Sequence, residues 1–569
     1  MHWQPAGRSL LGLIGLSLTA LSLTACMSAQ AAPATTAGAI DLPEPTQRHI
    51  SIVWSVSGDD NQDGVVSLRY RPTGSSAWKD SMPLRRVAAG SNAGFSWGES
   101  HRGSLFGLTP ATRYEIELSL VDPDGGSTQQ MISVSTRGIP QPGNGTLRAA
   151  TPTTLSSVLD AAQAGDIVEL SAGSYSGFTI NRSGSPGAPI TLRGSAGAVI
   201  SGEVGLFFQR HVLLQNLTIN GRIRFNGSDD ISITGCTINA RSQTAGDGIV
   251  SFLRAARAYI ANNTVTGITV WQETAFGASG DNIGEGIVVN GPGHVIENNT
   301  VSRFRDAISF MEGSEAVDQY SIDVLNNTIS QAADDGIEAD FCAHNCRIIG
   351  NRITNSFIAL SAQPSLGGPT YFVRNQIYSV AHVAFKLYRS SRGDVILHNT
   401  VVKHGDGFNA YPGTPIADAL VLNNLFLGGP AGTFNGFSSG SNRVVDLQSL
   451  QTSNSRLDYN GYGSTLSSFS GRIGGQSFGS LAQMRSSTSE IHGQQLGYDV
   501  FQSAVAFPAN PTSVYAPVNL ALAAGGAAQD RGLLIAGIND DYSGAGPDLG
   551  AIERQTDLPA GLIFHSGFE

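Results

Sequence analysis

Four carboxylates lie within seven positions near the middle of the chain: Asp334, Asp335, Glu338 and Asp340. Apolar residues separate the last acids, so the segment has the alternation of a half-buried strand. Successive side chains of a strand face opposite sides, which predicts Glu338 and Asp340 together on the outer face. Clustered carboxylates suit two kinds of chemistry, the binding of a cation such as calcium and general acid–base catalysis.

Asparagines repeat around this acidic segment and indicate the element that must carry it. They occur in short Asn-x-apolar motifs at Asn263, Asn299, Asn327, Asn351, Asn375, Asn399 and Asn424. Acid-Gly-Ile-like motifs such as "GDGIV", "GEGIV" and "DDGIE" follow most of them. The pattern predicts coils that stack into a solenoid, because one coil cannot bury its own apolar face. We expect the asparagines to hydrogen-bond from coil to coil as a ladder.

Aligning these motifs predicts which side chains of the neighbouring coils share the outer face with the acids. In "FIALSAQ" we expect Ile358 to point inward and Ala359 outward, with Gln363 as a substrate-binding candidate at the strand end. The outward residues predicted on the two following coils are Lys386, Tyr388, Arg389, Asn409 and Tyr411. Coils lie about 4.8 Å apart, close to the length of a sugar ring, so Lys386 is about 10 Å from Glu338. The strip predicts a saccharide groove in which tyrosines stack on sugar faces.

A second column of acids, Asp247, Glu285, Asp306 and Asp335, precedes the inward apolar residue on successive coils. Stacked carboxylates raise one another's pKa unless a cation or hydrogen-bond donors intervene. Calcium would relieve this repulsion. Alternatively, the acids accept backbone N–H groups in tight turns, which we favour for the column. For Glu338 and Asp340, flanked by Asp335, we favour a metal-binding role with Ca²⁺ as the candidate cofactor.

The repeats resemble the right-handed parallel β-helix of pectate-lyase-like families. "AGDIVELSAGSYSG" (164–177) is similar to their opening coil, and "PDLGAIE" (547–553) is similar to their closing segment. The resemblance spans residues 146–555 and implies an all-β fold. The fold hosts lyases, hydrolases, epimerases and inert adhesins, so the resemblance alone implies no single activity.

Polysaccharide lyases of the chondroitinase-B-like and alginate-lyase type share this fold. In them carboxylates hold calcium, a lysine removes the proton beside the uronate carboxylate, and an arginine assists the departing oxygen. The resemblance implies Glu338 and Asp340 as calcium ligands, Lys386 as base and Arg389 as acid. This sequence departs from the family pattern, because the stretch directly after the acids, "FCAHNCR", contains no lysine.

Two other functions fit the same residues. A glycoside hydrolase needs two carboxylates about 5–9.5 Å apart. Asp306 with Asp335, or Glu338 with Asp340, are candidate pairs. A glycan-binding or adhesin-like surface protein would instead use the tyrosines as binding platforms and leave Lys386 as a solvated charge.

The first residues predict export. In residues 1–26 an apolar run, too short to span a membrane, ends in "LTAC". This ending resembles the bacterial lipobox and implies a lipid anchor on Cys26, hence an outer-membrane or cell-surface lipoprotein. The alternative is ordinary secretion, or release into the periplasm, with cleavage after "AQA" (29–31).

The chain divides into further segments. A linker is predicted over 27–45, and residues 46–137 resemble a fibronectin type III-like β-sandwich, whose tyrosine corner "LTPATRY" contains Tyr114. A second linker (138–145) precedes a short amphipathic helix with Leu155 and Leu159 on one face, which we expect to cover the open end of the stack. Residues 430–530 lose the period and predict irregular coils, and 556–569 form a tail.

Composition limits the partners. Charged residues make up only 14% and glycines number 69, which suits a turn-rich β protein, and the net charge of −11 argues against nucleic acid. An acidic polysaccharide would need a local basic patch, and we expect a monomer. Cys342 and Cys346 flank a turn, where an exported protein can form a disulfide, although a metal pair is the alternative. Cys236 is expected to be a buried free thiol.

Overall fold

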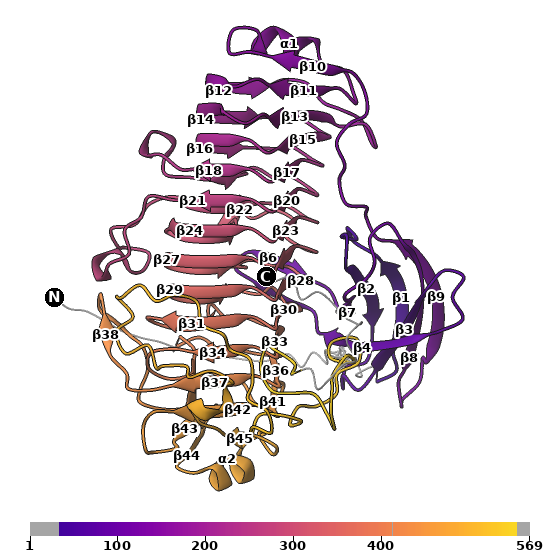
Figure 1. The fold of residues 1–569 in the computed structure, drawn as a ribbon. Helices are drawn as coiled ribbons and strands as arrows, with labels where there is room; N and C mark the ends of the chain where they lie inside the picture. Colours follow the sequence, from indigo (N-terminus) through magenta and orange to yellow (C-terminus); the bar gives the residue numbers. More distant parts are fainter. Residues whose placement is uncertain (1–32, 412, 555–569) are drawn as a thin grey trace, which may run out of the picture.

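The computed structural model describes residues 33–411 and 413–554, which form a small N-terminal β module beside a long solenoid (Figure 1). The predicted signal segment (1–26) with Cys26, and the predicted tail (556–569), lie outside the described residues. Within the described part, no helix has both the length and the apolar character needed to cross a membrane.

The N-terminal module is a β-sandwich of antiparallel strands. Its strands, in the order in which they pair, are β1 (Thr36–Asp41), β2 (Ile50–Ser57), β7 (Ser100–Leu105), β4 (Lys79–Val87), β3 (Val65–Pro72), β8 (Arg113–Val121) and β9 (Thr128–Ser135). The strand β4 pairs with β3 through its first part and with β7 through its last, so it links the two sheets. At the corner before β8, the Tyr114 hydroxyl accepts a hydrogen bond from the Thr109 N–H at 2.9 Å.

One predicted boundary is wrong. Residues 36–41 were expected in a linker, but they form β1, which pairs with β2. The reason is that Ile40 pairs with Trp54 and packs against the core of the module. An isolated hairpin, β5 (Gly90–Asn92) with β6 (Phe95–Trp97), extends from the same module.

The solenoid consists of coils whose strands stack in parallel. One wall contains β10 (Leu147–Ala150), β11 (Ile167–Leu170), β13 (Ile190–Gly194), β15 (Val212–Gln215), β17 (Ser232–Thr234), β20 (Tyr259–Ala261), β23 (Val295–Glu297), β26 (Asp323–Leu325), β28 (Cys346–Ile349), β30 (Thr370–Val373), β33 (Asp394–Leu397), β36 (Leu420–Leu422) and β41 (Arg456–Asp458). The helix α1 (Leu155–Ala161) buries Leu155 and Leu159 over the first coil, which confirms the predicted cap (Figure 1).

A second long sheet runs around the remaining sides of the coils. Its strands are β12 (Gly173–Ile180), β14 (Ala198–Leu206), β16 (Thr218–Arg224), β18 (Thr237–Asn239), β19 (Ile249–Val250), β21 (Thr264–Thr266), β22 (Glu285–Val289), β24 (Thr300–Phe304), β25 (Asp306–Phe310), β27 (Thr328–Glu338), β29 (Arg352–Ala362), β31 (Gln376–Val380), β32 (Phe385–Leu387), β34 (Thr400–Val402), β37 (Leu425–Gly428), β42 (Gly461–Ser464) and β45 (Gln494–Gln495). The long strands β27 and β29 pair with strands on both sides of a corner, so each belongs to two walls.

The predicted asparagine ladder is confirmed. From Asn263 to Asn460, each side-chain N–H₂ donates to the Oδ1 of the asparagine on the next coil at 2.8–3.0 Å. The same Oδ1 atoms accept backbone N–H groups of the preceding coil. The ladder ends on Glu490, and Cys236, which donates its N–H to Asn263, is a buried free thiol as expected. It satisfies polar groups inside the stack and thereby fixes the register of the coils.

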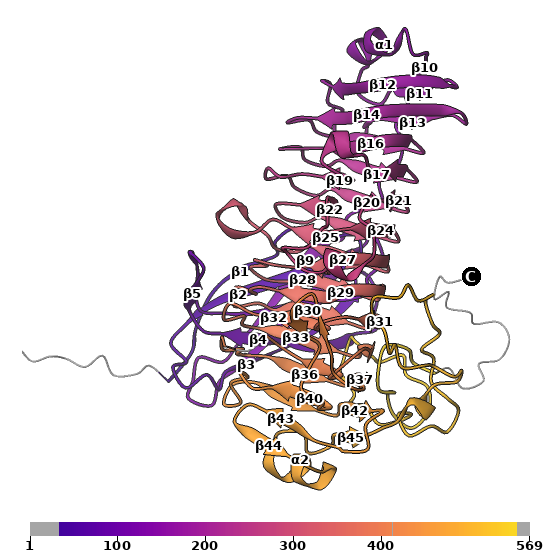
Figure 2. The ribbon, with the colours of Figure 1, turned by 90° about the vertical axis from the view of Figure 1, so that its left-hand side faces the viewer.

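The irregular C-terminal region has two parts. A small sheet of β35 (Phe408–Asn409), β40 (Val445–Leu447), β43 (Gly471–Ile473) and β44 (Gln476–Phe478) continues one wall, and α2 (Leu481–Ser487) follows it. The described residues after β45 form a short 3-10 helix, η4 (Tyr498–Val500), and irregular chain that runs back along the outside of the solenoid (Figure 2). They pack against Tyr378 and Val402 and reach the N-terminal module near Met82.

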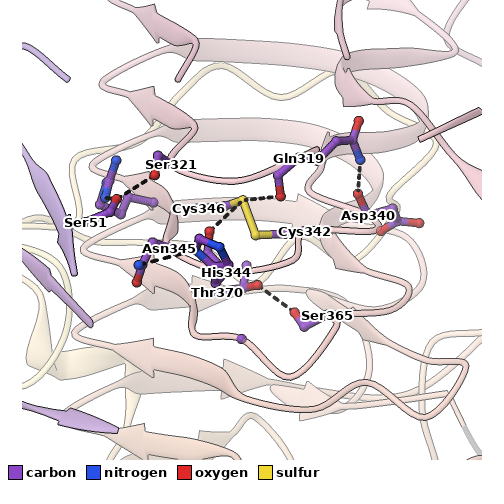
Figure 3. Close-up of a disulfide and its surroundings, with 12 residues drawn as sticks. Ser51, Gln319, Ser321, Asp340, Cys342, His344, Asn345, Cys346, Ser365 and Thr370 are labelled. Carbon is purple, nitrogen blue, oxygen red and sulfur yellow. Dashed lines mark hydrogen bonds between the residues drawn. A yellow bond between two sulfur atoms is a disulfide. The ribbon is translucent and has the colours of Figure 1, made fainter. Parts of the chain in front are cut away.

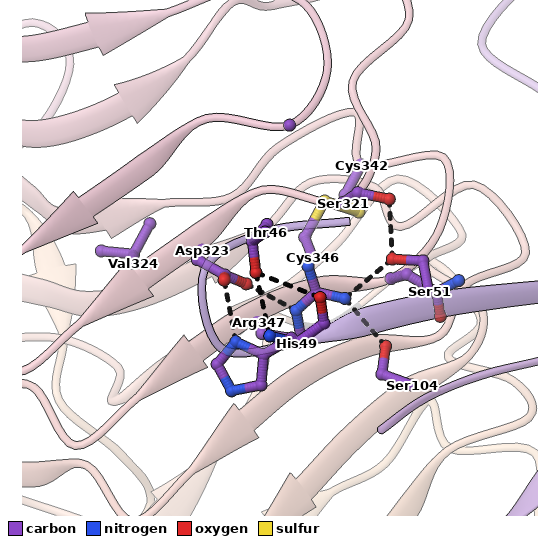
Figure 4. A network of polar contacts seen from close by, with 12 residues as sticks. Thr46, His49, Ser51, Ser104, Ser321, Asp323, Val324, Cys342, Cys346 and Arg347 are labelled. Atoms are coloured by element: carbon purple, nitrogen blue, oxygen red, sulfur yellow. Dashed lines mark hydrogen bonds and ion pairs between the residues drawn. A yellow bond between two sulfur atoms is a disulfide. The ribbon is translucent and has the colours of Figure 1, made fainter. Parts of the chain in front are cut away.

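The module is anchored to the solenoid by a buried polar network around Asp323 and Arg347, which are both residues of the solenoid. Arg347 Nε lies 2.5 Å from Asp323 Oδ1, and both side chains are fully buried. His49 Nδ1 of the module lies 2.8 Å from the other carboxylate oxygen, and Arg347 also donates to hydroxyls of Ser51 and Ser104 (Figure 4). Burial alone would raise the pKa of Asp323, but Arg347 and His49 hold it well below its usual range. A fixed orientation of the module follows from this network.

Candidate functional site

Five carboxylates form a buried cluster, the acidic site, on the wall made by β25, β27, β29 and β32. They are Asp306 at the start of β25, Asp334, Asp335 and Glu338 on β27, and Asp340 just beyond it. Each is at most 5% exposed. The inward neighbours of Glu338, Ile337 and Ala339, lie in the core as expected. The sequence therefore predicts the direction of Glu338 and Asp340, but not their burial.

Lys386 lies at the centre of this acidic site. In the register of the wall, Glu338 pairs with Ser361 and Ser361 pairs with Lys386, so the three share one column. The lysine side chain reaches back across the intervening coil, and its Nζ forms an ion pair with Asp335 and lies 3.5 Å from Glu338 Oε1. Burial lowers the pKa of Lys386, but the surrounding carboxylates raise it well above its usual value.

The turn acids of the second column accept backbone hydrogen bonds from the next coil. Asp306 Oδ1 accepts the N–H of Asp335 at 2.7 Å, and Asp247 Oδ1 accepts that of Glu285 at 3.3 Å. Glu285 instead accepts the hydroxyl of Ser309. The backbone role that the sequence favours is present for the two aspartates, although Asp306 also belongs to the acidic site.

Among the described residues, two fully buried oxygens of the acidic site have no hydrogen-bond partner. Asp340 Oδ1 accepts the Ser361 hydroxyl at 2.6 Å and the Gln363 N–H at 2.7 Å, whereas its Oδ2 is buried and unpaired. The Oδ1 of Asp335 is likewise buried and unpaired. A buried acceptor without a donor costs free energy, so each oxygen is suited to bind a cation or a ligand donor.

The acids fall into two groups with the spacing of metal ligands. Oxygens of Asp306, Asp334 and Asp335 lie within 4.8 Å of one another, as do oxygens of a second group of Glu312, Glu338 and Asp340. Gln363 thus borders the second group through its backbone N–H. The predicted ligand set of Asp335, Glu338 and Asp340 is divided between the two groups.

Burial and mutual repulsion raise the pKa of most of these carboxyls. Burial is the larger cause for Asp334, which reaches about 8, with Asp335 and Asp306 adding to it. Burial followed by Asp335 raises the pKa of Asp306 to about 7. Burial raises the pKa of Asp340 to about 7, and burial with Asp340 raises that of Glu338 well above its usual value. The site therefore holds more carboxyl groups than its cations neutralise at pH 7.

Arg305 is a site residue that sequence reasoning missed. Its Nε lies 3.4 Å from Asp306 Oδ2 and 3.8 Å from Asp334 Oδ2, and its side chain is 37% exposed. A half-exposed guanidinium beside buried acids is suited to bind a carboxylate from solvent. The available signal was its position directly before the acid of the "RDAIS" motif, together with Asp334 directly before Asp335.

Aromatic rings border the acidic site on the side of the following coils. The ring centroids of Tyr388 and Tyr411 lie 5.2 Å apart, and those of His382 and Tyr411 4.8 Å apart. His382 stacks on Phe357 at 5.2 Å. The two tyrosines are half-buried and Arg389 is exposed. Asn409, by contrast, is buried, and its Oδ1 lies 3.5 Å from the Nζ of Lys403. Both tyrosines therefore border the acidic site, whereas the Asn409 side chain makes a structural contact with Lys403.

Two loops cover the wall beside these rings. The hairpin β38 (Thr433–Phe434) with β39 (Phe437–Ser438) meets the loop of residues 267–284, where the Asn435 N–H donates to Glu273 and the Asn435 side chain donates to the carbonyl of Phe276. Their aromatic side chains pack on Ile358, which was expected to point inward. That expectation is wrong because β29 turns a corner between its pairing with β31, up to Ser356, and with β32, from Leu360. Alternation does not hold at the corner, and Ala359 and Leu360 both enter the core. The acids are therefore covered, not laid along an open strip.

The turn after Asp340 contains the disulfide Cys342–Cys346 (Figure 3). The Gln319 side chain, from the segment before β26, donates to the carbonyl of Asp340 at 3.0 Å. The segment "FCAHNCR" (341–347) is where the resembling lyases have their catalytic lysine. Here it has another role, because its Arg347 belongs to the interface with the N-terminal module. The disulfide and the interface both hold the chain directly after the acids.

A comparison with known families agrees with this architecture. The family model described as "Right handed beta helix region" matches residues 279–426, which contain the strands of the acidic site, β25, β27, β29 and β32. No curated protein matches the chain. A β-helix of this kind is common to polysaccharide lyases and glycoside hydrolases, so the match supports the fold without selecting an activity. The protein is a right-handed parallel β-helix preceded by a small β-sandwich.

Proposed function

We propose that this protein cleaves an acidic, uronate-containing polysaccharide by β-elimination at the acidic site. The observation that carries the proposal is the position of Lys386. Its Nζ lies between Asp335 and Glu338, in the column predicted by aligning the repeated motifs of successive coils. A lysine among carboxylates is the constellation that elimination beside a carboxylate requires, namely a base next to groups that hold a neutralising cation.

The residues fit a calcium ion. Calcium prefers several oxygen ligands, and the group of Glu312, Glu338 and Asp340 offers carboxylates together with the unpaired Oδ2 of Asp340. These residues would hold the cation, and Gln363 would help to orient Asp340. A bound calcium ion supplies positive charge that neutralises the uronate carboxylate and makes the adjacent proton more acidic.

The chain's own groups then have distinct roles. Neutralising Glu338 and Asp340 would remove two of the carboxylates that raise the pKa of Lys386, while burial lowers this pKa and Asp335 still raises it. Neutral Lys386 accepts the proton beside the uronate carboxylate, the electron pair forms the new C=C bond, and the C–O bond to the leaving sugar breaks. Arg389 stabilises the departing oxygen, which takes its proton from water, and Arg305 binds the uronate carboxylate.

Substrate must reach the covered wall. In this proposal the two loops joined by Asn435 open when the polymer binds, because Lys386 is only 6% exposed. The half-buried rings of Tyr388 and Tyr411 then provide faces on which sugars stack.

Hydrolysis is the second candidate, and one observation favours it. The pKa of Asp334 is about 8, so its carboxyl is protonated at neutral pH, while the neighbouring Asp335 is ion-paired with Lys386. A protonated acid beside an ionised carboxylate is the pair that a glycosidase uses. Their oxygens lie within 4.8 Å, which is closer to the spacing of retaining than of inverting enzymes.

One assay separates the candidates. The protein is incubated with a panel of uronate polymers, with calcium or with chelator, and both ultraviolet absorbance and new reducing ends are measured. Elimination gives absorbance from an unsaturated product, which chelator and Lys386→Arg should abolish, while the control Asp541→Asn at an exposed position retains activity. Reducing ends without absorbance would refute elimination and support hydrolysis, and binding without either product would support a non-catalytic glycan-binding role.

We also propose that the N-terminal module is a fibronectin type III-like domain, supported by the Tyr114 hydroxyl contact and the strand order. Export with a lipid anchor on Cys26 remains a proposal from the sequence. Metabolic labelling with a radioactive fatty acid, compared between the wild type and Cys26→Ser, tests the anchor, and equal labelling of both would refute it.

A further inference from the structure

The hairpin β5–β6 of the N-terminal module extends away from its own sheets. It pairs only with itself, through Gly90 with Trp97 and Asn92 with Phe95. Its two-residue turn, Ala93-Gly94, has φ values of 50° and 89°, the left-handed backbone that tight hairpins require. A short ribbon of this kind is unstable alone and depends on the surface it contacts. Figure 1 shows β6 of this hairpin at the level of β27 along the solenoid.

The aromatic residues of the hairpin contact the solenoid directly beyond the acidic site. The rings of Phe95 and Phe341 lie 5.9 Å apart, and Phe341 is the residue after Asp340. Trp97 packs so closely on the next coil that a Cβ at Gly367 would lie 2.7 Å from its Nε1. Both hairpin rings remain half-buried and so keep part of their surface exposed.

A third coil is contacted through Asn92. Its side-chain N–H₂ donates to the carbonyls of Arg389 at 2.8 Å and Ser390 at 3.1 Å. These contacts fix the turn that follows Lys386 and Tyr388 on the chain. The hairpin therefore spans the ends of three successive strands, β27, β29 and β32, which carry the acids and the lysine of the site.

We propose that the β5–β6 hairpin is a substrate-binding arm, which takes the sugar next to the one held at the acidic site; this inference rests on the proposed function. The partly exposed rings of Phe95 and Trp97 provide faces on which the ring of that second sugar stacks. The module thus belongs to the binding surface, because the contacts of its His49 with Asp323 and of its Ser51 and Ser104 with Arg347 fix its position on the solenoid.

The test compares Phe95→Ala and Trp97→Ala with Trp78→Ala, a matched control in the same module, where Trp78 contacts Arg69 and Arg71. KM for a uronate polymer should rise about 3- to 10-fold in both hairpin variants, with kcat within twofold of the wild type. Thermal midpoints equal to that of the wild type exclude misfolding. Asn92→Ala, which releases the hairpin without removing a ring, should also raise KM. Hairpin variants with the same KM as Trp78→Ala would refute the proposal of a substrate-binding arm.

Direct binding distinguishes failure of the arm from failure of the proposed function. Polymer affinity is measured by gel affinity electrophoresis for each variant, independently of turnover. A wild-type protein that binds polymer without cleaving it refutes elimination. In that case, weaker polymer binding by Trp97→Ala than by the wild type still supports the arm. A wild type that cleaves, with unchanged affinity in Phe95→Ala and Trp97→Ala, refutes the arm alone. No binding to any uronate polymer in the panel would overturn both proposals.

Discussion

Replacing Lys386 by methionine, a side chain of similar length without charge, tests the central contact of the acidic site. The change leaves Asp335 and Glu338 buried without their cation, and removing one partner of a buried ion pair typically costs about 3–5 kcal/mol of folding free energy. The cost depends on pH, because the folded-state pKa values of Asp334, at about 8, and Asp340, at about 7, are already raised with Lys386 present. Without it they rise further, so the variant takes up protons in place of the lost charge.

The sign of this dependence follows from linkage. A carboxyl whose folded-state pKa is raised stabilises the protein below its unfolded value, and this contribution is lost as the pH rises through the folded value. We therefore expect a loss of about 3–5 kcal/mol at pH 8.5 and about 1 kcal/mol at pH 5.5. Urea unfolding in chelator measures both, with Arg389→Met as an exposed control. An equal loss at the two pH values, or under about 1 kcal/mol at pH 8.5, would refute the reasoning.

Four further outcomes are expected. In chelator the wild type should lose stability between pH 5.5 and 8.5, and calcium should restore it, as measured by thermal midpoints; no effect of calcium would remove the cation site. Calcium affinity measured by titration calorimetry should rise with pH through about 7, the pKa of Asp340, and Asp340→Asn should lower it at least tenfold. Asn351→Ala, which interrupts the ladder, should cost about 1–3 kcal/mol and speed amide exchange on the flanking coils. Arg347→Ala should cost about 3–5 kcal/mol and make the module sensitive to limited proteolysis, whereas unchanged cleavage would show that other contacts hold it.

Much of the fold follows from local pattern. The asparagine period predicts the stack and its ladder, because each repeat has the same unmet hydrogen-bonding and burial requirements. Strict alternation at Glu338 and Asp340 predicts their outward direction. The same rule fails at Ile358, because β29 turns a corner there between its two pairing partners, and the consecutive residues Ala359 and Leu360 both enter the core. Alternation is reliable only while a strand stays straight.

The sequence alone determined the solenoid, its register and the coils that carry acids and cations, because these depend on periodicity along the chain. Only the tertiary structure decided how the charges meet: Lys386 reaches back over Ser361 to its carboxylates, and Arg305 joins them from a neighbouring coil. It also decided the burial of the acids, since the loops that cover the wall come from distant segments of the chain. Ion pairs and burial depend on distances in space, which a chain pattern does not specify when long side chains and separate loops set them.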